Sequence, residues 1–224
     1  MDKDHHTCSR NVDGKYFVKN GTTNYGKQRY KCKGCGKTFV KQYSYQACKP
    51  DTNNWILNLV KEGTSVRSTS RLLNISPTTV IVRVLSISQS IKKPYIALGK
   101  SYEMDELATY IQSKNNRIWV AYAIRLDTKE VVNFVVGKRT NRTLRCVTNT
   151  LVLAEARSIS TDKLQNYRSL IPESIHTTKQ RGINHIERKN LSLRTHVKRL
   201  SRRTICFSRS LAMLIACLKI YFWG

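Results

Sequence analysis

The chain has 224 residues, enough for one domain or for two to three small ones. Forty Lys and Arg residues against fourteen Asp and Glu residues give a formal net charge of +26. Such an excess disfavours a compact monomer without a partner and favours a polyanion, because Lys and Arg release counterions when they contact phosphates. Nucleic acid is therefore the leading candidate partner, and an anionic membrane surface is the weaker alternative.

Other features exclude further classes of protein. No stretch reaches about 18 uninterrupted apolar residues, so we expect no membrane span. The first six residues lack a basic flank followed by an apolar run, so we expect no secretory signal. The seven cysteines are odd in number and unevenly spaced, which favours a reducing compartment over a disulfide framework. These features predict a cytoplasmic protein.

Residues 1–45 predict a zinc ribbon with one structural Zn²⁺. The run Cys32-Lys33-Gly34-Cys35-Gly36 suits a tight metal knuckle, because glycine lets the backbone turn its N–H groups toward thiolate sulfurs. His5 and Cys8 supply two further ligands at the matching spacing, with His6 as a substitute for His5. Residues 17–21 predict a strand and turn. The alternatives are unrelated thiols beside a histidine pair, or a redox Cys-x-x-Cys.

Residues 46–94 predict a helical DNA-binding domain. Helices are expected at 53–61 and 65–73, followed by a turn and a third helix through residue 84. Ser76 can cap the third helix, with Pro77 at its first position. The last two helices resemble a helix-turn-helix, which would place Thr78, Thr79 and Arg83 in the major groove. An ordinary helical bundle or connector is the alternative.

Residues 95–224 predict an α/β domain. The β-branched and aromatic runs 117–124 and 131–136 are strand-like, and a polar turn at 127–129 separates them. Together with a strand near 101–107 they predict three antiparallel strands. A helix at 140–153, a strand at 157–161, and helices at 163–170, 180–200 and 204–221 complete the expected order.

Three acids, Asp105, Asp162 and Glu187, predict a catalytic metal site. Glu187 is the single acid among nine Lys and Arg residues between positions 179 and 203. If the three carboxylates meet, they can hold two Mg²⁺ or Mn²⁺ ions about 3.5–4 Å apart, the arrangement that serves phosphodiester transfer. Arg194 lies two helical turns after Glu187, so both side chains project from nearly the same face, where Arg194 would bind a DNA phosphate. The alternative is a solvated helix face with incidental charges.

The order of elements resembles the RNase H-like fold of polynucleotidyl transferases. More narrowly, the chain is similar to bacterial DDE transposases of the insertion-sequence-one family, over nearly its whole length. The stretch around Glu187 is the most specific part. The matching runs are 30–35 with Lys37-Thr38, 103–106, Thr161-Asp162 with Tyr167, and 186–194. The chain departs from the family at His5, where a cysteine is usual, and at Lys163-Leu164.

The resemblance implies a zinc ribbon (1–45), a helix-turn-helix (46–94) and an RNase H-like catalytic domain (95–224). It implies that Asp105 bridges two Mg²⁺ ions while Asp162 and Glu187 each bind one. The expected activity is cleavage of the ends of an insertion sequence and transfer of 3′-hydroxyls into target DNA. The resemblance also implies that the partner is double-stranded DNA and that the protein forms a homo-dimer or higher assembly on it. When bound to DNA, the protein would be associated with the bacterial nucleoid. Further DNA contacts are expected from Arg194, Asn190 and Lys189.

Two other functions remain open at this point. The first is a non-catalytic zinc-ribbon and helix-turn-helix regulator, which has no need for the three acids to converge. The second is a degenerate, inactive transposase. An RNA-associated structural protein would explain the charge but not an α/β domain with isolated acids.

Overall fold

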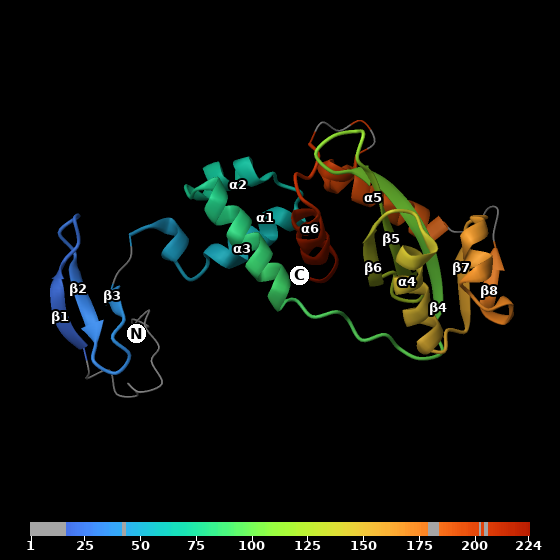
Figure 1. Ribbon diagram of the computed structural model, residues 1–224, viewed down its shortest axis with the longest axis horizontal. Helices are drawn as coiled ribbons and strands as arrows, with labels where there is room; N and C mark the ends of the chain where they lie inside the picture. The colour runs from blue at the N-terminus through green and yellow to red at the C-terminus, as the bar shows by residue number, and fades with distance from the viewer. Residues whose placement is uncertain (1–16, 42–43, 179–183, 202, 204–205) are drawn as a thin grey trace. The chain divides into compact units, whose positions relative to one another are not determined.

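The computed structural model describes residues 17–41, 44–178, 184–201, 203 and 206–224 (Figure 1). The chain divides into two compact units, Met1–Thr52 and Asn53–Gly224, each of which is described by itself. None of the helices within the described residues is long and apolar enough to cross a membrane. The further division predicted near residue 94 stays a prediction.

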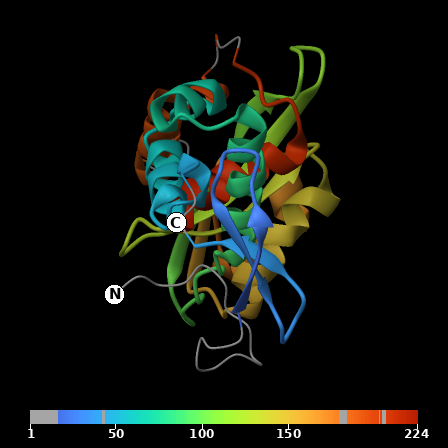
Figure 2. The ribbon, with the colours of Figure 1, turned by 90° about the vertical axis from the view of Figure 1, so that its left-hand side faces the viewer.

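The first unit contains a three-stranded antiparallel sheet. Its strands are β1 (Phe17–Thr22), β2 (Gln28–Cys32) and β3 (Thr38–Val40), which lie side by side in that order (Figure 2, blue). The strand expected at 17–21 is thereby confirmed. Phe17 and Phe39 pack edge to face with ring centroids 4.7 Å apart. A short 3₁₀ helix, η1 (Gln46–Cys48), follows the sheet.

The second unit begins with three helices, α1 (Thr52–Lys61), α2 (Val66–Leu73) and α3 (Pro77–Ser90). Ser76 caps α3, since its Oγ accepts a hydrogen bond of 3.0 Å from the backbone N–H of Thr79. Asn74 ends α2 in the left-handed region, at φ 51°, which lets the chain turn sharply into α3. The predicted helices are confirmed, although α3 extends six residues beyond the predicted end, from residue 84 to Ser90.

A mixed five-stranded sheet with the order β6-β5-β4-β7-β8 forms the centre of the second unit. The antiparallel strands are β4 (Ser101–Tyr110), β5 (Arg117–Arg125) and β6 (Val131–Gly137). Helix α4 (Asn141–Leu153) then leads to β7 (Ser158–Thr161), which pairs in parallel with β4. This mixed α/β architecture is consistent with an RNase H-like domain.

Helices cover both faces of the sheet, as the alternation of side chains along its strands requires. On one face, Met104 and Ala123 belong to a buried cluster with Leu144 and Val147 of α4. On the other face, buried residues of β4 and β5 pack with α5 (Asn184–His196) and α6 (Leu211–Trp223). Figure 1 shows α4 and α5 apart from each other, with strand β4 running between them.

The second half of the domain differs from the sequence prediction in three places. The helix expected at 163–170 is a 3₁₀ turn, η2 (Gln165–Ser169), followed by η3 (Glu173–Ile175) and an unpredicted parallel strand, β8 (His176–Thr178). The helix expected at 180–200 ends at His196, and η4 (Lys198–Leu200) follows it. Helix α6 begins at Leu211 rather than at residue 204, because Ser210 caps it by accepting from the N–H of Met213.

Candidate active site

Two of the predicted acids, Asp105 and Asp162, meet where the parallel strands β4 and β7 lie side by side. The register pairs Glu103 with Ser160, so Asp105, two residues further along β4, is level with Asp162. Oxygen atoms of Asp105, Glu106 and Asp162 all lie within 4.8 Å of one another. Strand β7 ends at Thr161, so its ladder with β4 stops just before Asp105 and Asp162. Side chains from both faces of β4 can therefore reach Asp162.

Hydrogen bonds fix the carboxylate of Asp105. Its Oδ1 accepts from the backbone N–H of Glu106 at 2.7 Å, and its Oδ2 accepts from Asn190 Nδ2 at 2.6 Å. Burial raises the pKa of Asp105, and the negative charges of Asp162 and Glu187 raise it further, against the lowering effect of the two hydrogen bonds. A cation bound among these carboxylates would stabilise their charged forms, and so would offset both the cost of burying Asp105 and the repulsion between the acids.

Arg139 connects the other two acids of the cluster. Its Nη2 lies 3.2 Å from Glu106 Oε2 and 3.9 Å from Asp162 Oδ2. The guanidinium group also lies over the ring of Trp119, 4.5 Å from the centroid, and Arg117 approaches the same ring at 4.7 Å. Trp119 thus holds Arg139 in a position where it partly neutralises the acids.

The buried carboxylate of Glu106 also interacts with the hydroxyl of Tyr167. The side chain of Glu106 is 0% exposed, and the Tyr167 hydroxyl lies close enough to lower its pKa, although neither this hydroxyl nor Glu106 Oε1 makes a hydrogen bond of standard geometry within the described residues. Burial raises the pKa of Glu106, and burial followed by the nearby charge of Glu106 raises the pKa of Tyr167. A buried carboxylate oxygen next to Asp105 and Asp162 can serve as a further ligand for a cation.

Helix α5 brings the third predicted acid, Glu187, toward the cluster. Glu103 anchors the start of this helix, since its Oε2 accepts a 2.9 Å hydrogen bond from the N–H of Ile186 and its Oε1 lies 3.2 Å from His185 Nδ1. One turn later, Asn190 binds Asp105 and accepts a 2.8 Å hydrogen bond from Tyr122. Glu187 is exposed, and its charge acts on Asp105, although it is not one of the three acids within 4.8 Å.

The residues predicted to contact DNA occupy several environments. Arg194 is half-buried and donates to the carbonyl of Leu200 at 3.3 Å, and Lys189 is half-buried on α5. Thr78 is exposed at the start of α3, whereas the hydroxyl of Thr79 lies 2.7 Å from that of Ser76. Arg83 donates to Asn53 Oδ1 at 3.1 Å. Their contacts with DNA stay predictions.

Of the four predicted zinc ligands, His5 and Cys8 lie outside the described residues. Cys32 ends β2 and is buried, and Cys35 is exposed in the turn that follows. The N–H of Gly36 donates to the carbonyl of Cys32 at 2.8 Å, and Gly36 has a φ of +73°. This is the tight turn that the glycine pattern predicted, and its metal content stays a prediction.

The sequence reasoning missed several residues that shape the site, namely Glu103, Glu106, Tyr122 and Arg139. Glu103 and Glu106 could have been identified from the sequence, because three acids within 103–106 are conspicuous in a chain with fourteen Asp and Glu residues. Strand alternation places Glu103 and Asp105 on one face and Glu106 on the other. Tyr122 and Arg139 gave no signal, because their roles depend on neighbours that are distant in the sequence.

Comparison with known proteins shows the family to which the chain belongs. The family model described as IS1 transposase matches residues 100–221, which include all three predicted acids. The iso-IS1n protein InsB of Shigella dysenteriae is 37% identical over 108 residues, covering 48% of this chain and 82% of the relative. The IS1 protein InsB of Shigella flexneri is 35% identical over 111 residues, covering 50% and 85%. The chain belongs to the IS1 transposase family.

Proposed function

We propose that the protein is a DNA transposase that cleaves the ends of an insertion sequence and joins their 3′-hydroxyls to target DNA. The observation that carries the proposal is the convergence of Asp105, Glu106 and Asp162 within 4.8 Å, beside the helix that bears Glu187. A net charge of +26 suits a DNA substrate. Membership of the IS1 transposase family supports the same reading.

The residues of the site fit a divalent metal. Mg²⁺ and Mn²⁺ prefer oxygen ligands, and Asp105, Asp162 and Glu187 would supply them, with the buried carboxylate of Glu106 as a further oxygen donor beside them. Bound metal would activate the attacking oxygen and neutralise charge on the phosphate. We propose that each active site binds two such ions.

The protein's own groups hold this constellation before substrate arrives. Asn190 and the N–H of Glu106 orient the two oxygens of Asp105, and Arg139 lies within 4 Å of both Glu106 and Asp162. The N–H of Leu164 donates to Asp162 Oδ1 at 3.0 Å, so Asp162 is also oriented from its own turn. Such preorganisation reduces the rearrangement needed during reaction.

Cleavage of DNA that carries the native element ends tests the proposed function. We expect the wild-type protein to release 3′-hydroxyl ends with Mg²⁺ and to release none in chelator-treated, magnesium-free buffer. Binding to the ends should persist in both buffers, because phosphate and groove contacts from the first 94 residues need no catalytic metal. Sequence-specific binding without cutting in either buffer would instead identify a regulator or an inactive transposase.

The proposed zinc ribbon gives a separate prediction. The Cys32→Ser variant should bind less Zn²⁺ than the wild type and should destabilise residues 1–45, because structural zinc contributes folding free energy directly. Bound zinc can be measured by elemental analysis, and local stability by hydrogen exchange. Cys146→Ser, which changes an exposed cysteine on α4, is the matched control. Full zinc occupancy in the Cys32 variant would argue against the ribbon.

A further inference from the structure

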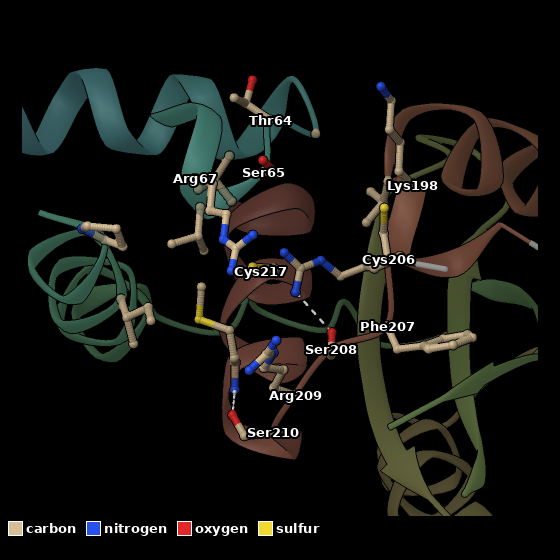
Figure 3. A pocket seen from close by; sticks show the side chains of 18 residues that line it. Thr64, Ser65, Arg67, Lys198, Cys206, Phe207, Ser208, Arg209, Ser210 and Cys217 are labelled. Carbon is tan, nitrogen blue, oxygen red and sulfur yellow. Dashed lines mark hydrogen bonds between the residues drawn. The ribbon is translucent and has the colours of Figure 1, made fainter. Parts of the chain in front are cut away.

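A pocket of about 580 Å³ lies in the second unit, outside the acid cluster (Figure 3). Its walls come from the α1–α2 turn, the first residues of α2 and α3, and the segment that leads from α5 into α6. None of its 18 lining residues is acidic. Its four cations are Arg67, Lys198, Arg199 and Arg209.

In the part of the chain that the structure describes, the arginines of this pocket have no carboxylate partner. No ion pair joins Arg67, Arg199 or Arg209 to an acid within the described residues. Figure 3 shows the guanidinium groups of Arg67 and Arg209 directed toward the space between α2 and the chain before α6. Arg199 is half-buried and donates to Ser208 Oγ at 2.9 Å, so this charge is held in place.

The residues that line the pocket supply no negative charge of their own. Cys217 lines it, but burial raises the pKa of this thiol even though the charge of Arg199 lowers it, so the thiol stays neutral at pH 7. Like charges that converge without a counter-charge repel one another and create a positive potential. An anion from outside the chain would relieve that repulsion.

The position of the pocket indicates what kind of anion it binds. Ser65 and Val66 at the start of α2, and Pro77 and Ile81 at the start of α3, all line it. When a pair of helices binds DNA, the second helix enters the major groove while the first crosses the backbone. Phosphates then accept hydrogen bonds from cations and from helix N-termini. A DNA backbone contacted by the N-termini of these helices would therefore lie beside residues that line this pocket.

Close packing fixes the wall where the helices meet the acid-bearing domain. Gly63, in the α1–α2 turn at φ +70°, approaches α5 so closely that a Cβ built there would lie 1.9 Å from the carbonyl oxygen of His196. This contact leaves no room for any side chain. Arg67 from α2 and Arg199 from η4 are thus held against the same cavity.

We propose that Arg67, Arg199 and Arg209 bind a phosphodiester of the DNA strand that runs between α3 and the acid cluster. The proposal rests on the proposed function, since it assumes a DNA substrate. It adds a sequence-independent anchor where the helical segment joins the catalytic domain.

DNA affinity measured against salt concentration tests this anchor. The double variant Arg67→Gln with Arg209→Gln should weaken binding by the same factor on element-end DNA and on scrambled DNA. The slope of log affinity against log salt should become shallower by about one, because both arginines contact the same phosphate. Measurements in magnesium-free buffer keep this result independent of cleavage, so the anchor and the enzymatic proposal can fail separately.

Arg157→Gln is the matched control, because this exposed arginine precedes β7, at the end of the strand opposite Asp162. A control slope that falls as much as that of the double variant would overturn the proposal, as would an unchanged slope in the double variant. Titration with inorganic phosphate separates the two sources of the anion. If the double variant loses phosphate binding but keeps wild-type DNA affinity and slope, the pocket binds a free anion and the DNA anchor is wrong.

Discussion

Replacing Glu187 by Gln should lower magnesium-dependent cleavage of element-end DNA by a factor of roughly a hundred or more, the scale on which loss of one key electrostatic group acts. The variant removes a negative charge that already acts on Asp105 but keeps the size of the side chain. Glu187 is exposed in the first turn of α5, so the fold should be unaffected. The measurement is single-turnover cleavage at saturating DNA.

Two further variants make this result specific. Asp105→Asn should cause a loss at least as large, because Asp105 is one of the three acids within 4.8 Å of one another and is also the one on which the charge of Glu187 acts. Glu173→Gln neutralises an exposed acid in η3 and should cleave at the wild-type rate. Equal cutting by the wild type and the Glu187 variant would remove Glu187 from the active site, whatever the Asp105 variant does.

Replacing Glu103 by Ala should both destabilise the protein and impair cleavage. The carboxylate of Glu103 is buried and caps the start of α5 at Ile186. Removing it leaves a buried N–H without an acceptor, which costs about 1–3 kcal/mol. For a domain of this size we expect a fall in melting temperature of about 2–4 °C per kcal/mol. Thermal unfolding followed by circular dichroism measures this change.

The effect on cleavage follows from the position of Glu103 two residues before Asp105 on β4. The hydrogen bond between Glu103 and the N–H of Ile186 links α5 to the strand that carries Asp105, and α5 carries Glu187 and Asn190. A positioning role predicts a loss of about 10- to 100-fold, as for other groups that orient metal ligands. The loss should appear partly as a higher Mg²⁺ requirement, which simple destabilisation would not produce at a temperature where the variant is folded.

Glu103→Gln separates positioning from charge. The glutamine carbonyl still accepts from the N–H of Ile186, so most of the stability and cleavage should return. If Gln and Ala at position 103 behave alike in both assays, the hydrogen bond to α5 is not what holds Glu187 in place. A normal Mg²⁺ requirement in the folded Ala variant would also contradict the positioning role.

Regular elements with strong local signals were predictable from the sequence. Ser76-Pro77 marked the start of α3, and the β-branched runs marked β5 and β6, because capping and alternation depend on residues close in the chain. Strand β8 was missed because a His-Thr-Thr segment has no apolar alternation and forms only by pairing with β7. The start of α6 was misplaced because the run from residue 206 has apolar residues before its capping Ser210.

The sequence by itself determined the charge, the order of strands and helices from β4 to β7, and the candidacy of Asp105, Asp162 and Glu187, since all of these are local or compositional. Only the tertiary structure decided that Glu106 joins Asp105 and Asp162, and that Arg139 and Asn190 hold them. It also brought Arg67 and Arg199 to one pocket from different elements. The physical reason is that pairing of β4 with β7 and packing of α5 join segments more than fifty residues apart, which no local pattern encodes.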